Sequence, residues 1–90
     1  MNIPKNKFNK FKNKMKRLFL IKADFQDFKR ADGRNYFCPD CVTIEGLLSF
    51  YPRLRNELDV NYVDFNRPRK ILADLLGEEN QSCPVLVLEN

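Results

Sequence analysis

The chain has 90 residues, enough for one small domain with a thin hydrophobic core. It contains three cysteines and no histidine, which argues against a disulfide-stapled scaffold and against histidine-dependent catalysis. The formal net charge is +4, but seven of the sixteen Lys and Arg residues stand before residue 18, where there is no acidic residue. The basic charge therefore belongs to the N-terminal segment, and we expect no nucleic-acid partner for the remainder of the chain.

Residues 1–17 are predicted to be a basic, disordered extension, and residues 18–90 to be the folded domain. The extension is rich in Asn and lacks Ala, a composition that forms poor isolated helices. The alternative is a basic amphipathic arm for an anionic membrane or RNA, because four apolar residues recur at helical spacing, namely Phe8, Phe11, Met15 and Leu18. No segment has the features of a secretory signal or the length of a membrane span, so we expect a cytoplasmic protein without a membrane partner.

After residue 17, strands and helices are predicted to alternate. The predicted strands are 17–22, 60–65 and 85–88. The predicted helices are 39–58 and 67–76. This alternation is typical of an α/β domain built on one sheet. The intervening connection at 23–37 is long, and its aromatic residues either form a lip that faces a substrate or pack back onto the domain; they are Phe25, Phe28 and Tyr36.

The first predicted helix carries one apolar stripe, formed by Ile44, Leu47, Leu48, Tyr51, Leu54 and Leu58. Pro52 is expected to divide this helix near Tyr51, because proline cannot donate a helical hydrogen bond. Gly46, a poor helix former, indicates a close approach between two backbones. The second predicted helix has Asn66 as its expected N-cap and Gly77 as its expected end.

Cys38-Pro39-Asp40-Cys41 stands at the start of the first predicted helix. Two cysteines at this spacing share one face of the first turn and lie close enough to form a disulfide. Cys38 falls near the N-cap, where free backbone N–H groups and the helix dipole favour the thiolate, which is the attacking species. Pro39 suits the first helical position, whereas the charge of Asp40 opposes a neighbouring thiolate. We therefore expect redox chemistry with a reducing rather than a strongly oxidising potential.

The order strand, Cys-Pro-Asp-Cys on a helix, strand, helix, Ser-Cys-Pro, strand resembles the thioredoxin and glutaredoxin superfamily over residues 18–88. Further segments resemble an uncharacterised bacterial thioredoxin-like family of unknown function, namely 37–41, 45–48, 62–65, 67–69 and 77–81. The resemblance implies a β1-α1-β2-α2-β3 fold in which Cys38 is the nucleophile and Cys41 the resolving thiol. It also implies that Pro84 is a cis-proline facing the disulfide, with a substrate-binding surface formed by Cys83, Pro84, Pro39 and Asp40.

Two features depart from the superfamily pattern. Its members continue into a fourth strand and a last helix, whereas this chain stops at Asn90. We therefore expect three strands in the order 2-1-3, with residues 85–88 as an edge strand that supports a homodimer. The second departure is Cys83, which brings a third sulfur close to Cys38. It is an alternative disulfide partner, a site of regulatory oxidation, a metal ligand or simply a small apolar core residue.

The predicted function is that of a thiol–disulfide oxidoreductase with no cofactor beyond its redox-active disulfide. Its expected partners are a protein or low-molecular-weight disulfide as substrate and a cellular thiol as reductant. The alternative is metal binding, in which zinc or an iron–sulfur cluster is held by Cys38, Cys41 and Cys83. Zinc would then take its fourth ligand from a carboxylate, water or another subunit. A third interpretation is a truncated, non-catalytic binding module.

Overall fold

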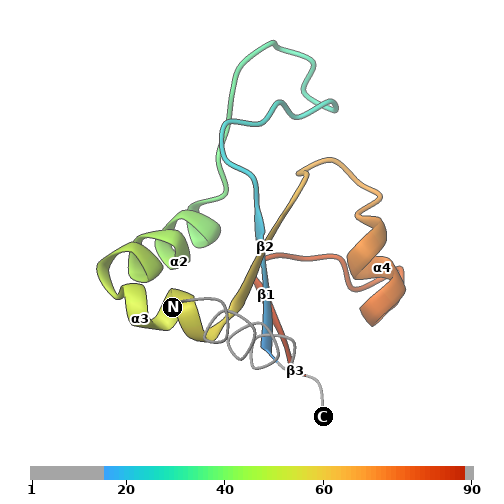
Figure 1. Ribbon diagram of the computed structural model, residues 1–90. Coiled ribbons are helices and arrows are strands. Elements are labelled where there is room, and N and C mark those ends of the chain that lie inside the picture. Colours follow the sequence, from blue (N-terminus) through green and yellow to red (C-terminus); the bar gives the residue numbers. More distant parts are fainter. Residues whose placement is uncertain (1–15, 89–90) are drawn as a thin grey trace, which may run out of the picture.

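The computed structural model describes residues 16–88 of the chain (Figure 1). The elements in chain order are β1 (Lys16–Ile21), α2 (Pro39–Phe50), α3 (Pro52–Glu57), β2 (Asp59–Val63), α4 (Lys70–Leu76) and β3 (Val85–Leu88). The predicted α/β class and the alternation of strands and helices are confirmed, with two short helices between β1 and β2. The predicted N-terminal extension lies outside the described residues, apart from Lys16 and Arg17, which belong to β1.

The three strands form one sheet in the order β2-β1-β3, as predicted. β1 and β2 run parallel, with Leu20 opposite Tyr62. β1 and β3 run antiparallel, with Phe19 opposite Val85. The carboxyl ends of β1 and β2 therefore meet at the same edge of the sheet, which is the edge where open α/β sheets place their ligand sites.

Helices cover both faces of this sheet. In Figure 1, α2 and α3 lie on one side of the strands and α4 lies on the other. Successive side chains of a strand point to opposite faces, so a central strand covered on both sides is apolar along its length. β1 meets this condition, because the four residues at 18–21 are all buried. The helices contribute Leu48 of α2 and Leu72 of α4 to the same core.

The division of the first predicted helix at Pro52 is confirmed, since α2 ends at Phe50 and α3 begins at Pro52. The predicted apolar stripe is only partly buried, and Tyr51 leaves the helical path with a φ of −122° and a ψ of 80°. Leu48 is 1% exposed, but Leu47 and Tyr51 are 43% and 54% exposed. The expected close approach at Gly46 is wrong, because a Cβ placed there would meet nothing within 4 Å.

The start of the second predicted helix differs from the structure. α4 is capped by Arg69, so Asn66 is not its N-cap. The Asn66 side chain instead joins two loops, since its Nδ2 donates to the carbonyl oxygen of Gln26 at 2.8 Å and its Oδ1 accepts from the backbone N–H of Phe28 at 3.1 Å. The predicted end of this helix is confirmed at Gly77, whose φ of +101° suits glycine.

Candidate functional site

Cys38 is the N-cap of α2, as the sequence predicts. Its backbone is extended, with a φ of −88° and a ψ of 112°, and its Sγ accepts a hydrogen bond from the backbone N–H of Cys41 at 3.3 Å. The Cys38 side chain is half-buried, and both Pro39 and Asp40 are exposed in the first turn of α2. The Cys38 sulfur thus lies at the end of α2 that carries the free backbone N–H groups and the positive end of the helix dipole.

Cys41 occupies the opposite environment. Its side chain is 3% exposed and belongs to the core, and its Sγ accepts the backbone N–H of Ile21 at 3.3 Å. Burial raises the pKa of Cys41 to about 12, and the neighbouring Cys38 adds to this shift. At neutral pH, Cys41 is therefore a protonated thiol, and Cys38 is the more exposed cysteine of the pair.

Cys83 lies at the same end of the sheet. The Cys83–Pro84 peptide bond is cis, as predicted, and both side chains are half-buried. β3 is antiparallel to β1 with Val85 opposite Phe19, and Cys83 comes two residues before Val85, toward the end of β1 where the backbone N–H of Ile21 donates to the Sγ of Cys41. Burial raises the pKa of Cys83, and the charges of Arg69 and Cys38 also act on it, in opposite directions. The fold thus brings the three predicted cysteines to one region, where all three are free thiols.

The predicted metal alternative has no preformed site in residues 16–88. No group of three or more His, Cys, Asp or Glu side chains in this part of the chain is arranged to hold a metal ion. Likewise, none of its helices is long and apolar enough to span a membrane.

Arg69 and Gln81 belong to this region, although no motif in the sequence assigns them a role. Arg69 is 7% exposed, and its Nη1 donates to the carbonyl oxygen of Gln81 at 2.6 Å. The Oε1 of Gln81 in turn accepts the backbone N–H of Arg69, also at 2.6 Å. These bonds fix the segment that leads into Cys83. The segments 67–69 and 77–81 were noted for their resemblance, but an arginine beside a proline gives no local signal that it is buried.

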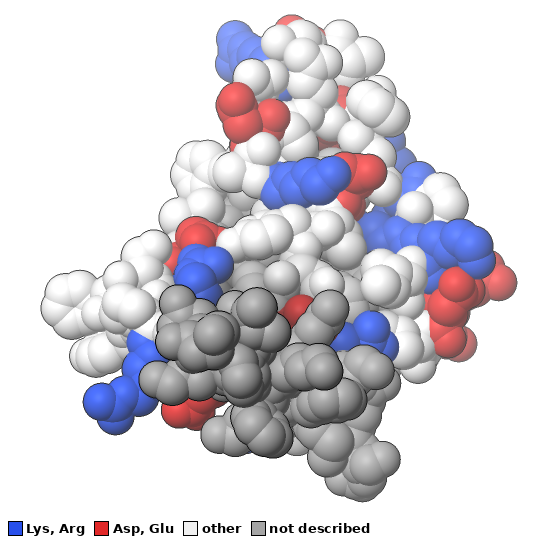
Figure 2. Space-filling view, viewed as in Figure 1, with Lys and Arg blue, Asp and Glu red and all other residues white. Residues whose placement is uncertain are grey.

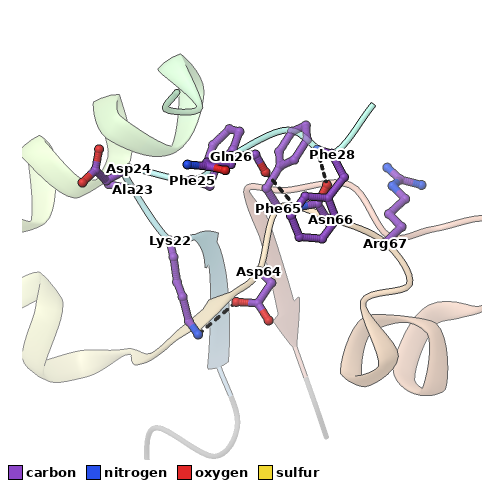
Figure 3. Close-up of a pocket in the computed structure, with 10 residues that line it drawn as sticks. All are labelled: Lys22, Ala23, Asp24, Phe25, Gln26, Phe28, Asp64, Phe65, Asn66 and Arg67. Carbon is purple, nitrogen blue, oxygen red and sulfur yellow. Dashed lines mark hydrogen bonds and ion pairs between the residues drawn. The ribbon is translucent and has the colours of Figure 1, made fainter. Parts of the chain in front are cut away.

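A cavity of about 550 Å³ lies at the carboxyl ends of β1 and β2. Figure 3 shows its walls, which include Phe65, Asn66 and Arg67 after β2 and residues 22–26 and Phe28 after β1. Phe25 packs back onto the domain and stacks on Phe65, with ring centroids 4.1 Å apart. Phe28 remains 75% exposed and is the part of the predicted lip that reaches solvent. None of the three cysteines lines this cavity, so the cavity is separate from the thiol region.

Cys41 lines a separate cavity of about 270 Å³, together with Glu45 and Tyr62. Glu45 accepts a hydrogen bond from the Tyr62 hydroxyl at 2.7 Å and pairs with Arg55. This network is exposed or half-buried, and the Tyr62 hydroxyl raises the pKa of Arg55. The carboxylate of Glu45 therefore lies one helical turn after Cys41, on the side of α2 that faces β2.

The described surface carries charges of both signs. Figure 2 shows Lys and Arg side chains interspersed with Asp and Glu side chains over the visible face. Two exposed ion pairs are typical of this pattern, one between Lys22 and Asp64 at 3.0 Å and one between Lys70 and Asp74 at 2.9 Å. Exposed pairs of this kind contribute little to stability.

Comparison with known families gives one match. A family model described as a protein of unknown function, DUF3088, matches residues 15–90. The chain belongs to the DUF3088 family. Comparisons with curated proteins and with solved structures found no match. The description of DUF3088 carries no activity, so the function of this member has to be argued from its own side chains.

Proposed function

We propose that this DUF3088 protein is a thiol–disulfide oxidoreductase in which Cys38 is the nucleophile and Cys41 the resolving thiol. The observation that carries the proposal is the contrast between the two sulfurs. Cys38 is half-buried at a helix N-terminus and accepts an N–H bond, whereas Cys41 is 3% exposed with a pKa raised to about 12. A dithiol exchange needs this contrast, because one thiol must attack the substrate disulfide first and the other must attack the mixed disulfide afterwards.

The reaction proceeds in two exchanges. The Cys38 thiolate attacks one sulfur of a substrate disulfide, that disulfide bond breaks, and the other substrate sulfur leaves as a thiolate. The Cys41 thiol then loses its proton and attacks the Sγ of Cys38, which releases the second substrate sulfur and forms the Cys38–Cys41 disulfide. The substrate has gained two electrons and the protein has lost two. A cellular dithiol, or two monothiols, reduces the protein again.

The arrangement of the elements supports a finer proposal, that the domain belongs to the thioredoxin and glutaredoxin superfamily. A Cys-x-x-Cys motif begins the helix after a central strand, a parallel and an antiparallel neighbour flank that strand, and the cis Cys83–Pro84 bond precedes the antiparallel neighbour. In that arrangement the exposed Pro39 and Asp40, together with the half-buried Cys83 and Pro84, form the surface that receives the substrate.

The proposed activity is tested by measuring disulfide reduction with dithiothreitol as the reductant. Insulin serves as a protein disulfide and cystine as a small one. The wild-type protein accelerates the reduction of at least one of them, and Cys38→Ser lowers the rate to the uncatalysed value. The matched control is the double variant Cys38→Ser/Ser49→Cys, which restores an exposed thiol on α2 away from its N-terminus. An equal rate in wild type and Cys38→Ser, or full rescue by Ser49→Cys, contradicts the proposal.

A further inference from the structure

Two cavities adjoin at the carboxyl ends of β1 and β2. The larger is the cavity of about 550 Å³ drawn in Figure 3, and the smaller has a volume of about 320 Å³. Cavities that bind small molecules span about 300–1,000 Å³. The two cavities share a common wall, which is formed by Phe28, Phe65, Asn66 and Arg67. Their arrangement therefore suits one ligand that has two distinct parts.

The common wall is held in place by contacts within the chain. The Asn66 side chain donates to the carbonyl oxygen of Gln26 at 2.8 Å and accepts the backbone N–H of Phe28 at 3.1 Å. It therefore ties the loop after β1 to the segment after β2. The ring of Phe65 stacks on that of Phe25, with an interplanar angle of 4°. A ligand would meet walls that are already positioned, which lowers the entropic cost of binding.

The larger cavity is aromatic and balanced in charge. Lys22 pairs with Asp64 at 3.0 Å. The two other charged residues of its lining, Asp24 and Arg67, have opposite signs. Phe28 is 75% exposed, so the fold leaves most of the surface of this ring uncovered. Aromatic rings attract one another in offset-stacked and edge-to-face arrangements, and this cavity therefore suits a planar ring.

The smaller cavity carries an excess of positive charge. Its charged lining residues are Lys29, Arg67, Arg69 and Asp27, and the Asp27 carboxylate pairs with Arg30 at 3.5 Å. Within residues 16–88, none of the three cations of this lining forms an ion pair. Arg69 is 7% exposed, and its guanidinium donates there to backbone carbonyl groups, which satisfy the donors but supply no negative charge. An anion bound in this cavity would supply the missing charge.

We propose that the two cavities form one binding site for a small aromatic anion. The planar ring of the ligand lies in the larger cavity against Phe28, and its carboxylate or phosphate group lies in the smaller cavity beside Arg67 and Lys29. Arg67 lines both cavities and is exposed, and none of the dashed lines in Figure 3 reaches it. Its planar guanidinium can donate two parallel N–H bonds to a carboxylate or a phosphate. None of the three cysteines lines either cavity, so the site does not depend on the proposed function.

The site is tested by isothermal titration calorimetry at low ionic strength with four probes. Adenosine monophosphate combines a ring with a phosphate, and indole-3-acetate combines a ring with a carboxylate. Adenosine supplies a ring without the anion, and inorganic phosphate supplies the anion without a ring. At least one of the two aromatic anions is expected to bind about tenfold or more tightly than adenosine and phosphate, since hydrogen bonds to charged groups are the stronger ones. The tighter of the two aromatic anions identifies the anionic group that the site prefers.

Two variants locate the site, and each has a matched control. Arg67→Gln removes the cation and is expected to raise the dissociation constant at least about tenfold, whereas Arg67→Lys keeps the charge and restores binding in part. Phe28→Ala removes the exposed ring and is expected to raise the dissociation constant about fivefold. The controls are Arg53→Gln on α3 and Phe50→Ala at the end of α2, where Phe50 is 77% exposed. Neither control residue lines the two cavities, so neither change should alter the dissociation constant.

Backbone amide chemical shifts of isotopically labelled protein give an independent readout. The tighter-binding probe is expected to move the signals of residues 26–29 and 65–67. No binding of either aromatic anion, inorganic phosphate that binds as tightly as both of them, or an equal effect of Arg67→Gln and Arg53→Gln would overturn the site. Cys38→Ser is expected to bind the probe as the wild type does, so the site and the proposed function can each fail without the other.

Discussion

The backbone N–H of Cys41 donates a hydrogen bond to the Sγ of Cys38 at 3.3 Å, so the buried cysteine supports the sulfur of the accessible one. The sulfur of Cys41 is in turn held by the backbone N–H of Ile21, in the central strand of the sheet. One turn of helix α2 therefore carries two thiols whose surroundings differ in exposure and in charge.

The first prediction concerns the order of alkylation. With iodoacetamide at neutral pH and under native conditions, Cys38 is expected to react first and Cys41 last, because Cys41 is 3% exposed and protonated. We expect a difference of about a hundredfold or more between the two rates. Peptide mapping at successive times measures each rate separately. Comparable rates for Cys38 and Cys41 would show that the two environments do not control reactivity.

Stability at alkaline pH is expected to depend on Cys41. Its pKa is about 12 in the folded protein and close to the ordinary 9.0 in the unfolded chain. Between these two values the folded protein holds a proton that the unfolded chain has lost, so the free energy of unfolding falls as pH rises from about 9 to about 12. The slope from this one group is about 1.4 kcal/mol per pH unit.

Urea unfolding of the reduced protein across this pH range measures the loss. Cys41→Ser is a small change in side-chain size and removes the titration, so the stability of this variant should fall less steeply with pH than that of wild type. Parallel curves for the two proteins would mean that Cys41 ionises as an ordinary exposed thiol.

Two glycines give a matched test of the backbone. Gly46 lies inside α2 and Gly33 lies in the loop before it, and in both cases an added Cβ meets nothing within 4 Å. Gly46→Ala is expected to stabilise the protein by about 0.5–1 kcal/mol, because alanine is the better helix former. Gly33 has a φ of +70°, so Gly33→Ala is expected to destabilise it. Thermal unfolding measures the melting temperature of both variants. Changes in melting temperature of the same sign would contradict the backbone conformations assigned to the two glycines.

The order of the elements was predictable because its signals are local. Apolar runs marked the strands, Pro52 marked the break between α2 and α3, and Gly77 marked the end of α4. The N-cap position of Cys38 followed from the same kind of signal. These features depend on residues that are neighbours in the chain, and patterns in the sequence can therefore predict them.

The features that sequence did not predict depend on distant residues. The Arg69 backbone pairs with a side chain 12 positions away, that of Gln81, and Asn66 pairs with a carbonyl group 40 positions away, that of Gln26. No local pattern distinguishes a buried arginine from an exposed one, or an N-cap asparagine from one that joins two loops. The candidate thiols were therefore identified from sequence, whereas the residues that position them required the fold.

Strand β3 is expected to support self-association. Within residues 16–88 it pairs with β1 alone, and its Leu86 and Leu88 side chains are 48% and 66% exposed. An edge strand with exposed leucines offers both backbone groups and apolar surface to a second copy. Sedimentation velocity at increasing protein concentration should show a reversible dimer.

Leu88→Lys should shift this equilibrium to monomer, because a charge on an edge strand opposes pairing. Ile71→Lys is the control, since Ile71 is 42% exposed on α4 and away from the edge. A wild-type protein that stays monomeric at every concentration, or an equal effect of both lysines, would remove β3 from consideration as an interface.

The central claim is that Cys38 and Cys41 form a reversible redox pair, and a redox titration tests it most directly. The Cys83→Ser variant isolates the pair, and it is equilibrated in buffers of graded glutathione and dithiothreitol ratio, quenched with acid and mapped by mass spectrometry. The account predicts one Cys38–Cys41 disulfide with a single two-electron midpoint in the reducing range, near the value of about −270 mV known for thioredoxin. Two thiols that remain reduced in every buffer, or that form only mixed disulfides with glutathione, would contradict it.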